Sequence, residues 1–123
     1  MDVPGASTVV RGGLVTYQTD TKTLLAGVDA DLIARSGVVS DPVARAMAEG
    51  TRVRLGVDIA VSSTGLAGPD GGTPDCPVGT VYIGVSTARE TKAIRLTLAG
   101  DRASIRQQAA ERAIGAIIEA TRG

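Results

Sequence analysis

The sequence contains no histidine, tryptophan or phenylalanine, only two tyrosines and a single cysteine. Without histidine, the chain cannot form a Ser-His-Asp or Cys-His catalytic centre or a histidine-ligated zinc site. Two tyrosines offer too little aromatic surface for the stacking platforms that bind RNA or single-stranded DNA. The lone Cys76 excludes an internal disulfide and a multi-cysteine metal cluster, so we expect no metal and no cofactor. Any nucleophilic chemistry has to come from lysine, tyrosine, serine or threonine.

Charge and length exclude further classes. Lysine plus arginine equals aspartate plus glutamate at 13 each, so no net field favours nucleic acid or a membrane surface as the partner. No apolar run approaches about 18 residues, and the first ten residues do not resemble a signal peptide, which predicts a cytoplasmic protein. The 123 residues predict one domain, 1–123, whose core consists of Val, Ile, Leu and Ala.

Apolar periodicity and turn residues predict alternating strands and helices. The predicted strands are 9–17, where Gly12-Gly13 indicates a bulge or a close backbone approach, then 58–61, 80–86 and 93–98, the last two joined by a hairpin at 89–91. The predicted helices are one from Thr19 or Asp20 to Gly27, one over 29–35, one that begins at Asp41-Pro42 with the apolar face Val43, Ala46, Met47, Gly50 and Val53, and one after Asp101 with the stripe Ile105, Ala109, Ala113, Ile114, Ile117 and Ile118. This pattern predicts an α/β fold, a mixed β-sheet covered by helices.

The stretch 57–72 combines a buried strand with a glycine- and hydroxyl-rich loop. Four glycines surround Ser62, Ser63, Thr64, Pro69 and Asp70. Backbone N–H groups can approach an anion closely where no Cβ intrudes, so the loop is typical of a ligand site. The same residues are also typical of a structural turn without a ligand, and Asp70 suits turn geometry better than binding.

Three segments resemble the CinA C-terminal domain family. Residues 63–72, Ser-Thr-Gly-Leu-Ala-Gly-Pro-Asp-Gly-Gly, followed by Pro77-Val78-Gly79-Thr80-Val81, are similar to its signature. Tyr17 and Lys22 with Leu25-x-Gly27-Val28, and Gly100-Asp101-Arg102, resemble two further family segments. Members of this family of competence-damage inducible proteins act as nicotinamide-nucleotide amidohydrolases, or NMN deamidases, in pyridine nucleotide salvage. The resemblance therefore implies a three-layer α/β/α fold and hydrolysis of the amide of nicotinamide mononucleotide (NMN), a small-molecule substrate.

The resemblance also implies roles for single residues. The implied catalytic residues are Lys22 as the base, Tyr17 and Thr64, and the implied substrate-binding residues are Ser63, Gly65, Ala67, Gly68 and Arg102. Position alone favours a solvated surface lysine at Lys22, although a helix N-terminus and burial would lower its pKa. Arg102 is either a phosphate ligand or an ordinary first-turn arginine.

One departure from the family concerns the nucleophile. Family domains begin with a strand and a helix that carry a Glu-Ser-Cys-Thr-Gly-Gly-like segment, which supplies the serine, and no such segment occurs in these 123 residues. We therefore expect a domain that lacks the family's first strand and helix, is incomplete at its N-terminus and is inactive by itself. An exposed sheet edge would favour a homo-oligomer. The alternatives are a remnant that binds a nucleotide or phosphate, and an interaction module that pairs through this edge.

Overall fold

The centre of the molecule is a sheet of three strands. The computed structural model describes residues 2–122. Strand β1 (Ile59–Gly65) pairs with β2 (Thr80–Thr87), and β2 pairs with β3 (Thr91–Thr97). Both pairs of described strands are antiparallel, in the order β1-β2-β3, and the predicted hairpin joins β2 to β3.

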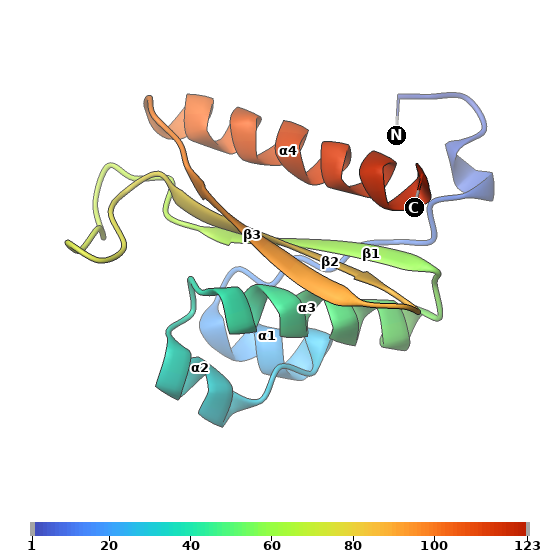
Figure 1. Cartoon of the computed structure of the whole chain (residues 1–123), viewed down its shortest axis with the longest axis horizontal. Coiled ribbons are helices and arrows are strands. Elements are labelled where there is room, and N and C mark those ends of the chain that lie inside the picture. Colours follow the sequence, from blue (N-terminus) through green and yellow to red (C-terminus); the bar gives the residue numbers. More distant parts are fainter. Residues whose placement is uncertain (1, 123) are drawn as a thin grey trace.

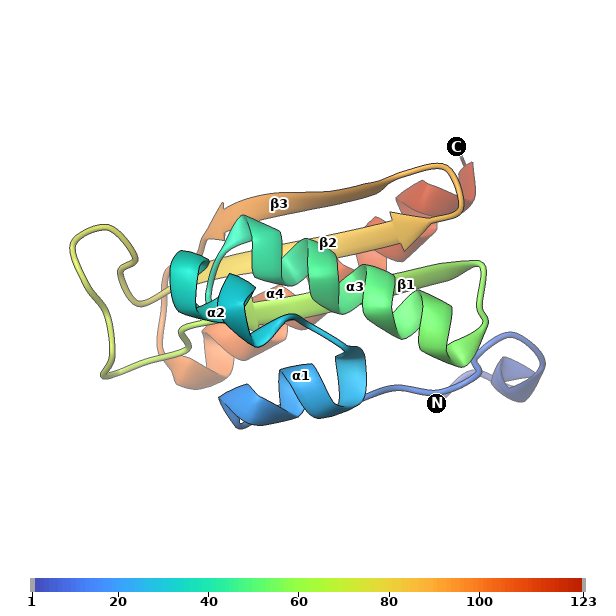
Figure 2. The same ribbon diagram turned by 90° about the horizontal axis from the view of Figure 1, so that it is seen from below.

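Helices cover both faces of this sheet. Helices α1 (Thr19–Ala26), α2 (Ala30–Ser36) and α3 (Asp41–Leu55) lie on one face, and α4 (Arg102–Arg122) lies on the other (Figure 1). A short 3-10 helix, η1 (Ala6–Thr8), precedes them. Figure 2 shows the sheet from the side of α1–α3, with α4 behind it. The predicted three-layer α/β/α fold is confirmed.

Capping and turn residues account for most helix ends. Gly27 ends α1 in the left-handed conformation, and the Asp29 carboxylate caps α2 by accepting a hydrogen bond from the Asp31 N–H. The first residue outside α3 is Ser40, one residue before the predicted cap, and Pro42 lies in the first turn. The Asp101 carboxylate accepts from the Ser104 N–H at 2.9 Å, as predicted for the cap of the last helix.

Two predicted apolar faces are narrower than the periodicity indicated. On α3, Val43 and Met47 are buried against Ala26 and Val28, whereas Val53 is 64% exposed. The prediction that Val53 belongs to the buried face is wrong, because Val53, ten residues after Val43, lies at the margin of the apolar stripe. On α4, the core-facing row is Ile105, Ala109, Ala113, Ala116 and Ala120, so the prediction that Ile114 and Ile118 are buried is also wrong. None of the described helices is long and apolar enough to cross a membrane.

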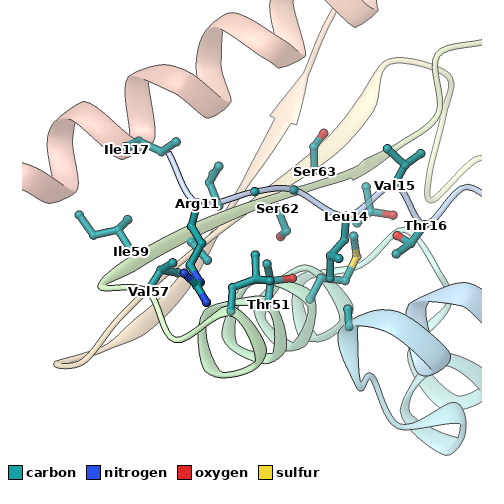
Figure 3. A pocket seen from close by; sticks show the side chains of 18 of the residues that line it. Arg11, Leu14, Val15, Thr16, Thr51, Val57, Ile59, Ser62, Ser63 and Ile117 are labelled. Carbon is teal, nitrogen blue, oxygen red and sulfur yellow. The ribbon is translucent and has the colours of Figure 1, made fainter. Parts of the chain in front are cut away.

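The segment 9–17, predicted as a strand, belongs to no sheet. It runs as irregular chain, and among the described residues its part 11–17 makes no backbone–backbone hydrogen bond. A strand requires a neighbouring strand edge within hydrogen-bond distance, and here a cleft separates the segment from β1 (Figure 3). Leu14 is nevertheless packed against the cluster formed by α1 and α3. The predicted strand is therefore wrong, and Gly12-Gly13 marks neither a bulge nor a close backbone approach, since no backbone atom lies within 4 Å of a Cβ added at either glycine.

Gly50 permits the close contact between α3 and α1. A Cβ at this position would lie 1.8 Å from the Ala26 carbonyl oxygen, a backbone atom that cannot move independently. We expect Gly50→Ala to lower the free energy of unfolding by about 1–3 kcal/mol, through overpacking. Urea denaturation followed by circular dichroism measures the change.

Gly115 provides the matched control for Gly50. It also lies inside a helix, but nothing lies within 4 Å of its added Cβ. Gly115→Ala should therefore stabilise the protein by about 0.5–1 kcal/mol, through helix propensity alone. Equal stabilisation by both substitutions would show that the contact between α1 and α3 is not close at Gly50.

Candidate functional site

A long cleft separates residues 7–17 from the free edge of β1. Its volume is about 1470 Å³, and its second long wall consists of residues 55–66. Met47 and Thr51 of α3 contribute to it from one side, and Ile117 and Thr121 of α4 contribute from the other. Figure 3 shows the segment with Arg11, Leu14, Val15 and Thr16 running alongside β1. The cleft thus continues the plane of the sheet and is covered by the same helical layers.

Lys22 is the buried cation of this cleft. It lies in α1, is only 6% exposed, and its Nζ donates a hydrogen bond to the Thr16 carbonyl oxygen at 2.6 Å. Burial lowers the pKa of Lys22 because removal from water disfavours the charged ammonium. Position alone had favoured a solvated surface lysine, and the burial contradicts that interpretation. A lysine that loses its proton more readily is suited to accept a proton from a hydroxyl.

Tyr17 lies next to Thr16 at the end of the same wall. It belongs to the lining of the cleft, but its side chain is 84% exposed. Tyr17 and Lys22 are therefore neighbours through the backbone of Thr16. In the described structure no hydrogen bond joins their side chains.

The side chains of β1 alternate between the two faces of the sheet. The Ser62 hydroxyl donates to the Ala44 carbonyl at 2.6 Å, and the Thr64 hydroxyl donates to the Val38 carbonyl at 2.9 Å. Both hydroxyls are buried and hold β1 to α3 and to the chain that precedes it. Ser63 points to the opposite face, toward α4, and is exposed (Figure 3). The hydroxyl proton of Thr64 is thus already donated within the protein.

The backbone of β1 also alternates. The Leu66 N–H donates to the Thr80 carbonyl at 3.0 Å, and these two residues continue the register of the β1–β2 pair. In an antiparallel pair every second residue makes the hydrogen bonds, so the even-numbered residues of β1 bond to β2. The N–H and C=O groups of Val61, Ser63 and Gly65 consequently point away from β2, into the cleft. The Gly65 N–H therefore faces the cleft.

Three of the expected binding residues lie elsewhere. The Arg102 guanidinium donates to the Gly68 carbonyl at 2.8 Å, which ties the start of α4 to the glycine-rich loop. Ala67 packs against the core cluster that contains Val81 and Ile105. None of these three residues lines the cleft. The structure therefore groups Lys22, Tyr17, Ser63, Thr64 and Gly65, and it separates Ala67, Gly68 and Arg102 from them.

Sequence reasoning did not identify the acceptor of the Lys22 ammonium. Thr16 contributes its backbone carbonyl, and a backbone acceptor leaves no signal in the sequence. Thr51, which also lines the cleft, has no distinguishing neighbour. The one sequence signal for Thr16 was its position near the end of the predicted strand 9–17, because strand ends are common positions for ligand groups.

The family model of the CinA C-terminal domain matches residues 1–121. A CinA-like protein of Gemmatimonas aurantiaca is 50% identical over 112 residues, which are 91% of this chain and 26% of that protein. A CinA-like protein of Akkermansia muciniphila is 44% identical over 122 residues, 98% of this chain and 30% of its own length. The chain thus spans between a quarter and a third of these curated relatives.

Solved structures show the same fold. The competence/damage inducible protein CihA from Agrobacterium tumefaciens superposes with a TM-score of 0.92 at 32% identity, covering 95% of this chain and 72% of that chain. A CinA superfamily protein from Escherichia coli gives a TM-score of 0.80 at 28% identity, with 85% and 60% of the two chains covered.

Proposed function

Since this chain belongs to the CinA C-terminal domain family, we propose that it is a nicotinamide-nucleotide amidohydrolase-like domain. The reaction is hydrolysis of the carboxamide of NMN, in which the C–N bond breaks and water supplies the oxygen of the acid. The products are nicotinate mononucleotide and ammonia. Lys22 is the base that removes a proton from the attacking hydroxyl. The Gly65 N–H, which faces the cleft, is a donor for the oxyanion that forms.

The observation that carries this proposal is the burial of Lys22 in the cleft. Lys22 is buried and donates to one neutral carbonyl, so its pKa is lowered. The other positions on Nζ remain available for a hydrogen bond to a ligand. Such a lysine is costly for folding, and a titratable group whose pKa is shifted by burial in a cleft is a candidate for catalysis. Ser63 and Gly65, on the β1 wall, contribute polar groups to the same cleft.

Hydrolysis also needs a nucleophile within reach of the base. Among the described residues the only hydrogen bond of the Lys22 ammonium goes to the Thr16 carbonyl, and no serine or threonine hydroxyl is hydrogen-bonded to it. The Ser62 and Thr64 hydroxyls are engaged with backbone carbonyls. Catalysis through an activated hydroxyl requires a base–nucleophile pair, and within residues 2–122 the base has no hydroxyl paired with it.

A second candidate follows from that unpaired base. A domain that keeps Lys22, Ser63 and Gly65 in a large cleft can bind a nucleotide without hydrolysing it. The two functions differ in one observable, which is whether ammonia is released when NMN is bound.

The test measures ammonia release and NMN binding on the same sample. We expect the 123-residue chain to bind NMN in isothermal titration calorimetry and to release no ammonia above background. A family member that carries the Glu-Ser-Cys-Thr-Gly-Gly segment serves as the active control. Lys22→Ala should weaken or abolish binding, because it removes the buried cation from the cleft.

Two outcomes would contradict this account. Ammonia release by the 123-residue chain that Lys22→Ala abolishes would show that no further nucleophile is needed. If the natural chain does not bind NMN, and Lys22→Ala gives the same calorimetric titration and the same ammonia background, both the hydrolase and the nucleotide-binding proposals are wrong.

A further inference from the structure

A second hollow lies between the hairpin that joins β2 to β3 and the last turns of α4. Its volume is about 130 Å³. Both views place this hairpin and the C-terminal end of α4 at the same end of the molecule (Figures 1 and 2). The lining residues that matter here are Val85, Arg89 and Ile94 from the two strands and their hairpin, and Ala116, Glu119 and Ala120 from α4. None of them lines the cleft at β1, so the hollow is separate from the proposed amidohydrolase site.

The floor of this hollow is aliphatic. Val85 belongs to the buried core, whereas Ile94 on the edge strand β3 stays 44% exposed. Ala116 and Ala120 contribute the α4 side, and because alanine ends at Cβ, these two positions fill little of the space. The volume is close to the roughly 150 Å³ of an apolar cavity that accepts one benzene molecule. The hollow therefore has room for one small aliphatic group.

Charges of opposite sign stand on its two walls. Arg89 lies on the hairpin wall and Glu119 on the α4 wall, and among residues 2–122 neither of them forms an ion pair. Lys92 is a second cation of the hairpin wall, although Glu90 already pairs with it at 3.7 Å. A simple carboxylate or a simple amine would satisfy only one wall. A zwitterion can satisfy both, with its anion toward Arg89 and its cation toward Glu119.

We propose that this hollow binds a free branched-chain amino acid such as leucine. The aliphatic side chain lies against Ile94, Ala116 and Ala120, the α-carboxylate faces Arg89, and the α-ammonium faces Glu119. Most of the binding free energy comes from the apolar side chain, because exposed ion pairs contribute little. The dissociation constant is therefore expected in the millimolar range.

The test is a titration of the isotope-labelled 123-residue chain with L-leucine, followed by amide chemical shifts in NMR spectra. We expect saturable shifts at Ile94, Ala116 and Ala120, and unchanged shifts at Lys22 in the cleft. L-Alanine has the same charged groups but lacks most of the aliphatic side chain, so it should bind at least about tenfold more weakly. 4-Methylpentanoate and isoamylamine each lack one of the two charges and should bind about threefold more weakly than leucine.

Two pairs of variants separate the apolar part from the charged part. Ala116→Leu fills the hollow and should abolish leucine binding, whereas Ala110→Leu, exposed on the same helix outside the hollow, should bind like the natural chain. Glu119→Gln should weaken leucine binding about threefold without weakening that of 4-methylpentanoate, which has no ammonium. Its control is Glu111→Gln, exposed on α4 and outside the hollow. Because Glu119 is exposed, Glu119→Gln keeps the test decisive if Ala116→Leu does not fold.

Several outcomes would overturn the proposal. These are no saturable shift at tens of millimolar L-leucine, equal binding of L-alanine, and equal effects of Glu119→Gln and Glu111→Gln. Equal or tighter binding of N-acetyl-leucinamide, which carries neither charge, would also overturn it, in favour of a peptide side chain as the occupant. None of these measurements involves NMN or ammonia release, so their failure is distinct from a failure of the proposed hydrolysis.

Discussion

Gly79→Ala is expected to lower the free energy of unfolding by about 3–5 kcal/mol, a large part of the stability of a typical domain. Two independent effects combine at this residue. Gly79 has a φ of 96°, a conformation that L residues rarely adopt, and an added Cβ would lie 2.0 Å from the Leu98 carbonyl oxygen. Relief by backbone movement would break the bonds from Gly79 N–H to Leu66 and from Leu98 N–H to Gly79, each 2.8 Å long.

Gly71→Ala separates the two effects. Gly71 has nearly the same φ, 99°, but the nearest atom to its added Cβ is Leu66 Cδ2 at 3.7 Å, an ordinary contact. We expect it to lose only the conformational part, about 1–2 kcal/mol. Urea denaturation of both variants gives the comparison, with equal slopes as the check of two-state unfolding. Equal losses in the two variants would mean that the clash with Leu98 does not constrain the loop.

Gly79 matters to the candidate site because it closes the glycine-rich loop. Its bond to Leu66 joins the two ends of the loop directly beyond Gly65, and Arg102 holds the loop again at Gly68. The loop is therefore fixed at its base by backbone contacts. A Gly79→Ala chain that still folds should show faster amide exchange in the loop residues.

Local signals in the sequence predicted most of the fold. Helix ends are set by the backbone conformation of Gly27 and by the carboxylates of Asp29 and Asp101. These caps can therefore be predicted without knowing which other elements pack nearby. The hairpin between β2 and β3 is also local. The strand predicted for 9–17 is wrong for the opposite reason. Residues with strand propensity form a strand only when the edge of another strand lies beside them, and that is a tertiary feature.

The candidate site was less predictable than the fold. A family resemblance supplied the roles of the residues that line the cleft from α1 and β1, which are Lys22, Ser63, Thr64 and Gly65. The position of Lys22 in the sequence, taken alone, favoured a solvated lysine. Its burial depends on Thr16 and on the packing of α1 against α3, which are tertiary features. Arg102 was expected either to bind a phosphate or to be an ordinary first-turn arginine, and its hydrogen bond to the Gly68 carbonyl depends on a loop conformation that no sequence pattern encodes.

Lys22→Met is expected to change how stability depends on pH. Burial lowers the pKa of Lys22 in the folded chain from its ordinary value of 10.5. Between the lowered pKa and 10.5, the unfolded chain binds more protons at this residue than the folded chain does, so the stability of the natural chain rises with pH across that range. Below the lowered pKa the ammonium is charged in both states and the burial penalty is constant. The methionine variant has no such gain, because it carries no titrating group there.

The measurement is the difference in melting temperature between the natural chain and Lys22→Met from pH 7 to 11. This difference should shift in favour of the natural chain as the pH rises, with about 3–6 °C for each kcal/mol of linkage in a domain of this size. Lys92 is the only other lysine of the chain, lies exposed on β3, and makes Lys92→Met the matched control for loss of a charge without burial. A pH-independent difference for Lys22→Met, or the same trend in both variants, would mean that Lys22 is not a desolvated ammonium. In that case its assignment as the base would lose its physical support.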